Sequence, residues 1–193
     1  METCSNGFKR YIFFDRDGTI NFDEGYTHDI EKLTFIDGVI SFMRHYQASF
    51  DYIIVTNQAG IAKKKFSLNQ MYDFNSAMCS ELKSFGIFIK GLYFCPHHPE
   101  AVIEDLRINC TCRKPKPGLF EMAAEDFKID KLQSIIVGDK LTDIKAAYDF
   151  GIRKGFLISQ SEKERLKLIE FNKSKNCRFV GVSNFADINL KED

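Results

Sequence analysis

Two aspartates separated by a single residue follow a short apolar stretch near the start of the sequence. Asp15 and Asp17 belong to the run DRDGT, which comes directly after the residues YIFF at 11–14. If the chain stays extended through this run, both carboxylates lie on the same face. Two like charges this close repel each other unless a divalent cation or a proton compensates them. A solvated turn is the alternative, but the apolar stretch before the pair favours a buried acidic site.

Polar side chains also follow other apolar stretches of the chain. Thr56 comes after residues 52–55, and Asp139 follows Gly138 after residues 134–137. A continuous apolar run of this kind is typical of a strand that is buried on both faces. Ligands of an open α/β sheet bind outside the carboxyl ends of its strands. We therefore expect Asp15, Thr56 and Asp139 to meet at one site.

Helical patterns alternate with these strands. Apolar residues recur at helical spacing over 38–46, and Ser67 is a typical N-cap for a helix that runs to about residue 84. Further helices are predicted over 118–127 and 143–150, and further strands over 87–94, 154–158 and 179–182. The alternation predicts an α/β fold, a three-layer Rossmann-like parallel sheet with helices on both faces. We expect residues 1–193 to form a single domain around one core.

A second group of chemically capable residues is rich in sulfur. Cys95 begins the segment CPHH, and Cys110 and Cys112 flank a single threonine. Three thiolates and one imidazole, from His97 or His98, suit a closed tetrahedral Zn²⁺ site of the structural kind. Unliganded cysteines near a turn are the alternative. The other cysteines are scattered, and we expect ordinary thiols at Cys4, Cys79 and Cys177.

Composition and charge exclude several classes of protein. The chain has 193 residues, and its 27 Lys and Arg residues balance 27 Asp and Glu residues, whereas a general nucleic-acid binder needs a basic excess. No apolar run approaches the roughly 20 residues that span a bilayer. The first residues, METCSNGFKR, lack the apolar stretch of a secretory signal. We expect a cytoplasmic protein, monomeric by default, that binds neither nucleic acid nor membrane.

The acidic motifs resemble those of the haloacid-dehalogenase-like phosphatases. DRDGT after an apolar strand is similar to the first motif of that family, Thr56-Asn57 to the second, Lys114 to the third, and GDKLTD at 138–143 to the fourth. The order of the motifs and their places at strand ends agree from residue 11 to about residue 158. The resemblance implies a phosphatase with the Rossmann-like fold of this family.

The resemblance also implies a magnesium-assisted reaction. Asp15 would be the nucleophile that forms an aspartyl-phosphate, and Asp17 would act first as general acid and then as general base. Asp15 and Asp139 would bind the Mg²⁺ with their carboxylates, and Asp17 with its backbone carbonyl. A carboxylate can attack a phosphate dianion only when cations neutralise both groups.

Cationic and hydroxyl groups complete the implied site. Thr56 and neighbouring backbone N–H groups would hold the phosphoryl oxygens, and Lys114 would neutralise the charge that develops on the transferring group. We expect Asp143 to orient Lys114 or the metal shell. Lys140 is either a salt-bridged surface lysine or a phosphate contact.

In the same family the zinc loop carries its imidazole two residues after the first cysteine. This spacing implies that His97 is the ligand and that His98 is a loop residue. Cys112 directly precedes Arg113 and Lys114, so the zinc would fix the segment that directs Lys114 into the site. We expect no chemistry at the zinc itself, because four protein ligands leave no open position.

Short loops must choose the substrate, because the chain has no room for a large cap domain between 19 and 38 or between 57 and 67. The loops resemble those of the heptose-bisphosphate phosphatases of this family, in the segments GYTH at 25–28, FIDGV at 35–39, TNQAGIA at 56–62 and CRKP at 112–115. This resemblance implies removal of the 7-phosphate from D-glycero-D-manno-heptose 1,7-bisphosphate in heptose biosynthesis. The residues expected to contact this substrate are Gly25, Tyr26, His28, Asn57, Arg113 and Lys140.

A bisphosphate needs a second anion clamp, and the bidentate fork of Arg113 suits the distal phosphate. The chain departs from the resembled enzymes after Gly-Ile-Ala, where Lys63-Lys64 stands in place of Arg-Gly. Lys63, Lys64 or Lys65 would then contribute to the clamp or form a solvated surface. The alternatives are a histidinol-phosphate phosphatase, a polynucleotide 3′-phosphatase, which the neutral charge disfavours, and a catalytically silent zinc-stapled binding module.

Overall fold

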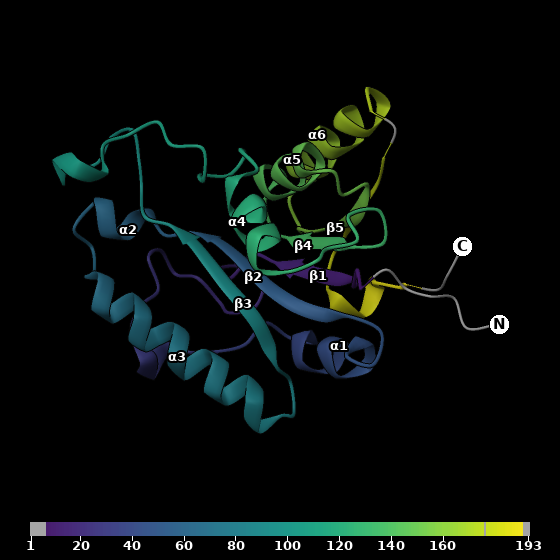
Figure 1. Ribbon diagram of the computed structural model, residues 1–193, viewed down its shortest axis with the longest axis horizontal. Helices are drawn as coiled ribbons and strands as arrows, with labels where there is room; N and C mark the ends of the chain where they lie inside the picture. The colour runs from purple at the N-terminus through teal and green to yellow at the C-terminus, as the bar shows by residue number, and fades with distance from the viewer. Residues whose placement is uncertain (1–6, 176, 191–193) are drawn as a thin grey trace.

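Six parallel strands form the centre of the protein, as seen in a computed structural model that describes residues 7–175 and 177–190 (Figure 1). Cys4 lies outside the described residues. Neighbouring strands pair in parallel throughout the order β3-β2-β1-β4-β5-β6. The strands are β1 (Tyr11–Phe14), β2 (Asp51–Asn57), β3 (Ile89–Cys95), β4 (Ile135–Gly138), β5 (Lys154–Ile158) and β6 (Arg178–Val182).

Side chains along each strand alternate between the two faces of the sheet, and both faces are apolar. Phe13 of β1 packs with Phe120 and Phe150 on one face, whereas Phe14 packs with Phe42 and Tyr52 on the other. All four residues of β1 are buried, which confirms the prediction of a strand covered on both sides. Figure 1 shows the resulting three layers, with α4, α5 and α6 over one face and α1 and α3 over the other.

Most helices begin and end where the sequence predicts. They are α1 (Val39–Tyr46), α2 (Ala59–Ala62), α3 (Leu68–Ser84), α4 (Gly118–Asp126), α5 (Leu141–Phe150) and α6 (Glu162–Lys173). Ser67 caps α3 through its side chain, which accepts a hydrogen bond from the Gln70 backbone, and Gly151 ends α5 with a φ of 120°. None of the helices in the described ranges is long and apolar enough to cross a membrane.

Two helices were not predicted, for different reasons. The α6 helix buries a single residue, Leu168, so its sequence has little apolar periodicity to detect. The α2 helix has four residues, too few for any periodic signal. It matters nonetheless, because it follows β2 directly and its residues Ala59 and Gly60 line the cavity of the site described below.

The direction in which successive strands are added to the sheet reverses between β1 and β4, the two central strands. β1, β2 and β3 extend the sheet one way, while β4, β5 and β6 extend it the other way. Such a switch point opens a crevice at the carboxyl ends of the strands. The segment from Thr19 to Gly38 contains only one short 3₁₀ helix, Ile30–Lys32, and the segment from Asn57 to Ser67 only α2. No large cap domain therefore covers the crevice, as predicted.

Candidate active site

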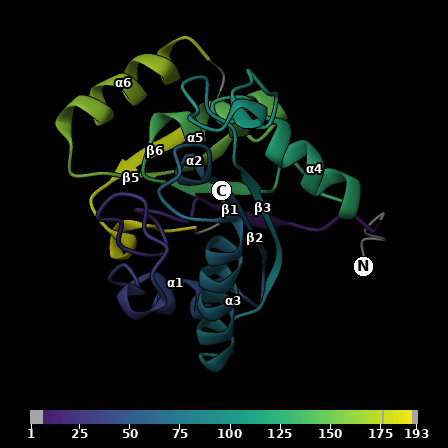
Figure 2. The same cartoon turned by 90° about the vertical axis from the view of Figure 1, so that its left-hand side faces the viewer.

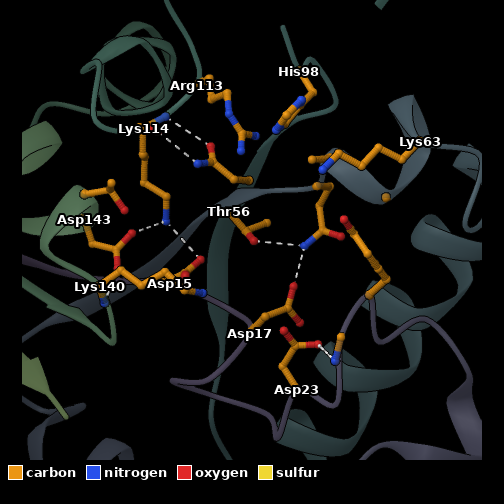
Figure 3. A pocket seen from close by; sticks show the side chains of 17 residues that line it. Asp15, Asp17, Asp23, Thr56, Lys63, His98, Arg113, Lys114, Lys140 and Asp143 are labelled. Carbon is orange, nitrogen blue, oxygen red and sulfur yellow. Dashed lines mark hydrogen bonds and ion pairs between the residues drawn. The ribbon is translucent and has the colours of Figure 1, made fainter. Parts of the chain in front are cut away.

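Polar side chains from several strand ends converge on one cavity of about 370 Å³. Asp15 and Asp17 reach it from the end of β1, Thr56 from β2, and Asp143 from the first turn of α5 (Figure 3). The turn Asp17–Gly18 allows the end of β1 to lie close to Asp139. Gly18 has a φ of +80°, and a Cβ at this position would lie 2.5 Å from Oδ2 of Asp139. Only glycine meets both conditions.

Lys114 lies between Asp15 and Asp143 and is almost fully buried. Its Nζ is 2.9 Å from Oδ1 of Asp15 and 2.7 Å from Oδ1 of Asp143, and it donates a 2.7 Å hydrogen bond to the carbonyl of Val55. Burial alone would lower the pKa of Lys114, but the charges of Asp143 and Asp15 outweigh it and raise the pKa above its usual value. Lys114 is therefore a permanent cation.

The carboxylates of Asp15, Asp139 and Asp143 form an acidic cluster, in which the potential ligand atoms lie within 4.8 Å of one another. Burial and the charges of Asp15 and Asp143 raise the pKa of Asp139 to about 7. Oδ1 of Asp139 is buried and has no hydrogen-bond partner among the described residues. A cluster of hard oxygen ligands with one unpartnered buried oxygen fits Mg²⁺. The side chain of Asp17 is not part of this cluster.

The Asp17 carboxylate turns instead toward nitrogen donors. It accepts hydrogen bonds from Arg16, from Gln58 Nε2 at 2.7 Å and from Asn21 Nδ2 at 3.1 Å. Burial and the neighbouring charge of Asp15 raise the pKa of Asp17, while Arg16 opposes this shift. For Asp15, burial also favours the neutral acid, but the Lys114 charge outweighs it and holds the pKa below its ordinary value. The environments of the two aspartates thus separate their protonation behaviour.

The second predicted motif lies at the end of β2. Thr56 is buried beside the cavity, and its Oγ1 accepts a 3.0 Å hydrogen bond from Gln58 Nε2. Asn57 was predicted to contact substrate. In the structure, its side-chain amide forms two hydrogen bonds with the main chain of Lys114. Its Nδ2 donates to the Lys114 carbonyl and its Oδ1 accepts from the Lys114 N–H, both at 3.1 Å. Asn57 thereby fixes the lysine that neutralises Asp15.

A group of basic residues marks the other end of the cavity. Arg113, His98 and Lys63 lie together in Figure 3, away from Asp143 and Lys140. Partial burial and the charges of Arg113 and Lys63 lower the pKa of His98. We name Arg113, His98 and Lys63 the basic end. Lys140 lies at the acidic end instead, with its Nζ 3.2 Å from Oδ2 of Asp139.

The predicted substrate loop only partly reaches the cavity. Gly25 and Tyr26 line it, whereas His28 does not. The His28 ring stacks on Phe66 at 4.9 Å, and its Nδ1 is 2.7 Å from the carbonyl of Tyr26. This stacking turns His28 into a neighbouring hollow formed by its own loop. His28 therefore supports Tyr26 in this structure.

The predicted zinc ligands gather into a second cluster. Atoms of Cys95, His97, Cys110 and Cys112 lie within 4.8 Å of one another. The Sγ of Cys95 is 3.1 Å from that of Cys112 and 3.5 Å from that of Cys110, and Nδ1 of His97 is 3.3 Å from Cys112 Sγ. Hydrogen bonding with Cys95 lowers the pKa of Cys112 to about 5. This set fits a tetrahedral soft metal site. His98 points elsewhere, and its Nδ1 accepts from the Glu100 N–H.

Two residues of the site were not singled out from the sequence. Gln58 links Thr56 to Asp17, and Arg16 holds Asp17. Gln58 follows the Thr56-Asn57 motif directly, and this placement just past a buried strand was the available signal. Arg16 stands between two aspartates after such a strand, where a charge is expected to be paired. Neither signal shows which way the side chain turns.

The HAD-hydrolase-like family model matches residues 111–175. A D-glycero-beta-D-manno-heptose-1,7-bisphosphate 7-phosphatase of Escherichia coli O6:H1 is 47% identical over 137 residues, which cover 70% of this chain and 72% of that protein. The protein of the same name from Haemophilus ducreyi is 41% identical over 152 residues, covering 78% of this chain and 83% of its own.

Solved structures agree with these sequence relatives. A D,D-heptose 1,7-bisphosphate phosphatase from B. bronchiseptica, complexed with magnesium and phosphate, superposes with a TM-score of 0.75 at 26% identity and covers 92% of this chain and 94% of its own. A HAD-like phosphatase from Mesorhizobium loti superposes with a TM-score of 0.74 at 31% identity, covering 78% of this chain and 73% of its own. The chain is thus a phosphoric monoester hydrolase that belongs to the haloacid-dehalogenase-like superfamily, in the family of the heptose-1,7-bisphosphate 7-phosphatases.

Proposed function

We propose that this protein removes the 7-phosphate of D-glycero-D-manno-heptose 1,7-bisphosphate in the synthesis of nucleotide-activated heptose. The observation that carries this proposal is the two-ended cavity, with Asp15, Asp143 and Lys114 at one end and the basic end at the other. A substrate with two phosphates can place one phosphate at each end. The names of the relatives specify this substrate and its β anomer for those proteins.

The reaction follows from the pairing of charges at the acidic end. Asp15 Oδ attacks the phosphorus of the 7-phosphate, and the bond between phosphorus and the sugar oxygen breaks as Asp17 gives that oxygen its proton. The aspartyl-phosphate is then attacked by a water that loses its proton to Asp17, which frees Asp15 and releases inorganic phosphate. Lys114, 2.9 Å from Asp15, balances the charge on the transferring group.

Mg²⁺ would be held by Asp15, Asp139 and the backbone carbonyl of Asp17, with Asp143 beside them. When bound, the ion supplies positive charge that lets an anionic nucleophile approach an anionic phosphate. Thr56 holds a phosphoryl oxygen from the β2 side, and Lys140 adds a further charge near Asp139. Burial lowers the pKa of Lys140, but the charges of Asp139 and Asp15 prevail and raise it, so it stays cationic.

The basic end supplies the clamp for the 1-phosphate. The Arg113 guanidinium is steadied by a 3.2 Å hydrogen bond from Nη1 to the carbonyl of His97. Lys63 joins Arg113 and His98 at the cavity, whereas Lys64 and Lys65 do not line it. Such a cationic end repels L-histidinol phosphate, whose amine is itself positively charged. The basic end therefore favours a sugar bisphosphate over that alternative.

The cysteine cluster is assigned to a structural Zn²⁺. Cys95, His97, Cys110 and Cys112 would fill all four positions of the ion, and Cys112 is two residues from Lys114. The zinc would therefore anchor the segment that carries Arg113 and Lys114. We further propose that the chain works in the cytoplasm as a monomeric single domain. None of the cysteines among the described residues forms a disulfide, which suits a reducing compartment.

A substrate panel with Mg²⁺ tests the proposed activity. We expect phosphate release from heptose 1,7-bisphosphate to exceed release from heptose 7-phosphate and from L-histidinol phosphate in kcat/KM. Asp15→Asn should abolish turnover while retaining substrate binding. A preference for L-histidinol phosphate would instead identify the chain as a histidinol-phosphate phosphatase. Substrate binding without any turnover in the wild type would support a catalytically silent binding module. Size-exclusion chromatography with light scattering tests the monomer.

A further inference from the structure

Arg16, between the two aspartates of the first motif, is the largest fully buried side chain in the described part of the chain, with 0% exposure. A buried guanidinium is costly unless its charge is paired and its N–H groups are satisfied. An ordinary structural position would be filled by an apolar residue at lower cost. The buried charge of Arg16 is therefore expected to serve Asp17, the proposed acid and base beside it.

The hydrogen bonds of Arg16 are directed first at Asp17. Nε donates to Oδ1 and Nη2 to Oδ2, each at 2.9 Å, which makes a two-pronged fork on one carboxylate. A fork of this kind fixes the plane of the carboxylate as well as its distance. Gln58 adds a 2.7 Å hydrogen bond to Oδ2. Free rotation of the Asp17 side chain is thereby prevented.

Arg16 itself is held from three other sides. Nη1 donates to Oδ1 of Asn75 on α3 at 2.8 Å, and Nη2 donates to the carbonyl of Thr27 at 2.9 Å. The guanidinium lies over the ring of Phe74, 4.7 Å from its centroid. These contacts come from α3 and from the loop that supplies Gly25 and Tyr26 to the cavity. The guanidinium therefore has a single orientation, and it passes that orientation on to Asp17.

We propose that Arg16 is a positioning residue that fixes the Asp17 carboxylate for proton transfer to and from the reacting oxygen. The inference rests on the proposed function, because it needs Asp17 to be the acid and base. Lysine cannot replace Arg16 in this role, since one ammonium group cannot bridge both carboxylate oxygens while also bonding Asn75 and Thr27. The consequence is a loss confined to reactions whose leaving oxygen needs a proton.

The test compares two esters of similar shape, phenyl phosphate and 4-nitrophenyl phosphate. Phenolate is about as basic as tyrosinate and needs a proton as it leaves, whereas nitrophenolate is a much weaker base. In kcat/KM, which ends at the first irreversible step, we expect Arg16→Lys to lose about tenfold more on phenyl phosphate than on the nitrophenyl ester. Arg10→Lys is the matched control, because Arg10 stacks on Phe50 at the opposite end of β1, and it should leave the ratio unchanged.

A double-mutant cycle separates this role from support of the substrate loop through Thr27. In an Asp17→Asn background, Arg16→Lys should cost less than about twofold on phenyl phosphate, since its route through Asp17 is gone. The isosteric variant Asn75→Asp places a second carboxylate beside the Arg16 guanidinium, at Nη1, which competes with Asp17 for its charge. This variant should shift the ester ratio in the same direction as Arg16→Lys. It therefore replaces Arg16→Lys in the test if Arg16→Lys does not fold.

Equal losses on both esters, or a full Arg16→Lys loss in the Asp17→Asn background, would overturn the positioning role while leaving the phosphatase assignment intact. A wild-type protein that releases phosphate from neither the aryl esters nor the sugar bisphosphate would instead overturn the proposed function, and the inference with it.

Discussion

The acidic cluster and the cysteine cluster are both candidate metal sites, but the fold supports them in opposite ways. Asp15 and Asp139 stand at the ends of the two central strands, β1 and β4, and Asp143 stands in the first turn of α5. Cys110 and Cys112 lie instead on a long connection after β3 whose only regular element is the 3₁₀ helix Glu104–Leu106. The sheet places one set of ligands, and a loop places the other.

This difference indicates which of the two sites is already ordered before its metal ion binds. The acidic cluster already contains a cation, because Lys114 pairs with Asp15 and Asp143 while burial keeps water away. Few buried apolar side chains hold the loop beyond Cys95. In Figure 2 this loop lies above α2. We infer that the acidic site is preorganised by the sheet, whereas the proposed zinc would order the loop as it binds.

Replacing Lys114 should break the acidic site most severely. Lys114→Met leaves Asp15 and Asp143 buried without their cation, which should cost about 3–5 kcal/mol of unfolding free energy. Loss of charge stabilisation should lower kcat/KM by about 10²- to 10³-fold. Chemical denaturation and phosphate-release assays measure the two effects. Lys116→Met is the control, since Nζ of Lys116 bonds Asn109 and the Cys110 carbonyl near the surface. Equal effects in both variants would contradict the preorganised site.

Removing a zinc ligand should act on the loop and reach the acidic site only through it. For Cys110→Ser we expect loss of bound zinc, faster backbone hydrogen exchange over residues 96–112 and about 10- to 100-fold lower activity. Exchange in β1 and β4 should not change. Cys177→Ser is the matched control, because Cys177 bonds Asn172 far from the loop. An unaltered exchange rate in the loop of Cys110→Ser would show that the loop orders without its ion.

The pH dependence of magnesium binding sharpens the contrast further. With a pKa of about 7, Asp139 binds a proton in the metal-free protein at mildly acidic pH, and the proton competes with Mg²⁺. The apparent Mg²⁺ affinity should therefore fall about tenfold per pH unit below 7 and level off above it. In the metal-free protein, the same raised pKa makes ionised Asp139 destabilising as the pH rises from about 4 to 7. Calorimetric Mg²⁺ titrations across this range measure the slope, and an affinity that is flat from pH 5 to 7 would contradict it.

The smallest expected effect concerns the backbone near the basic end. Lys64 has a φ of 53°, in the left-handed region that favours glycine, which is the residue that the resembled enzymes commonly carry there. Lys64→Gly should relieve this conformation and raise the unfolding free energy by about 1 kcal/mol without changing kcat/KM. Thermal unfolding measures the gain. A drop in activity would instead place the Lys64 side chain in substrate binding.

The sequence predicted the parts of this molecule that depend on burial and periodicity. The buried runs before Asp15, Thr56 and Asp139 led to the sheet and to the convergence of those residues. The α6 helix was missed because it has only one buried residue, and the direction of side chains after a strand was beyond reach. The hydrogen bond of Asn57 to the Lys114 main chain and the stacking of His28 on Phe66 depend on loop contacts between distant segments. Such contacts leave no periodic trace in the sequence.

The double hydrogen bond between Asn57 and the Lys114 backbone has a consequence for how the loop can vary. It ties the far end of the connection to β2, while Cys95, the last residue of β3, anchors the near end, so an exposed stretch between the two anchors can change in length. The entropic cost of a longer loop grows only slowly with its length. Peptide insertions near Ile108, which is exposed, should therefore be tolerated. Insertions near Val102 should be tolerated less well, because its backbone N–H donates to the Ala62 carbonyl of α2. Ile108 thus offers a place to graft a tag or binding epitope onto an active enzyme.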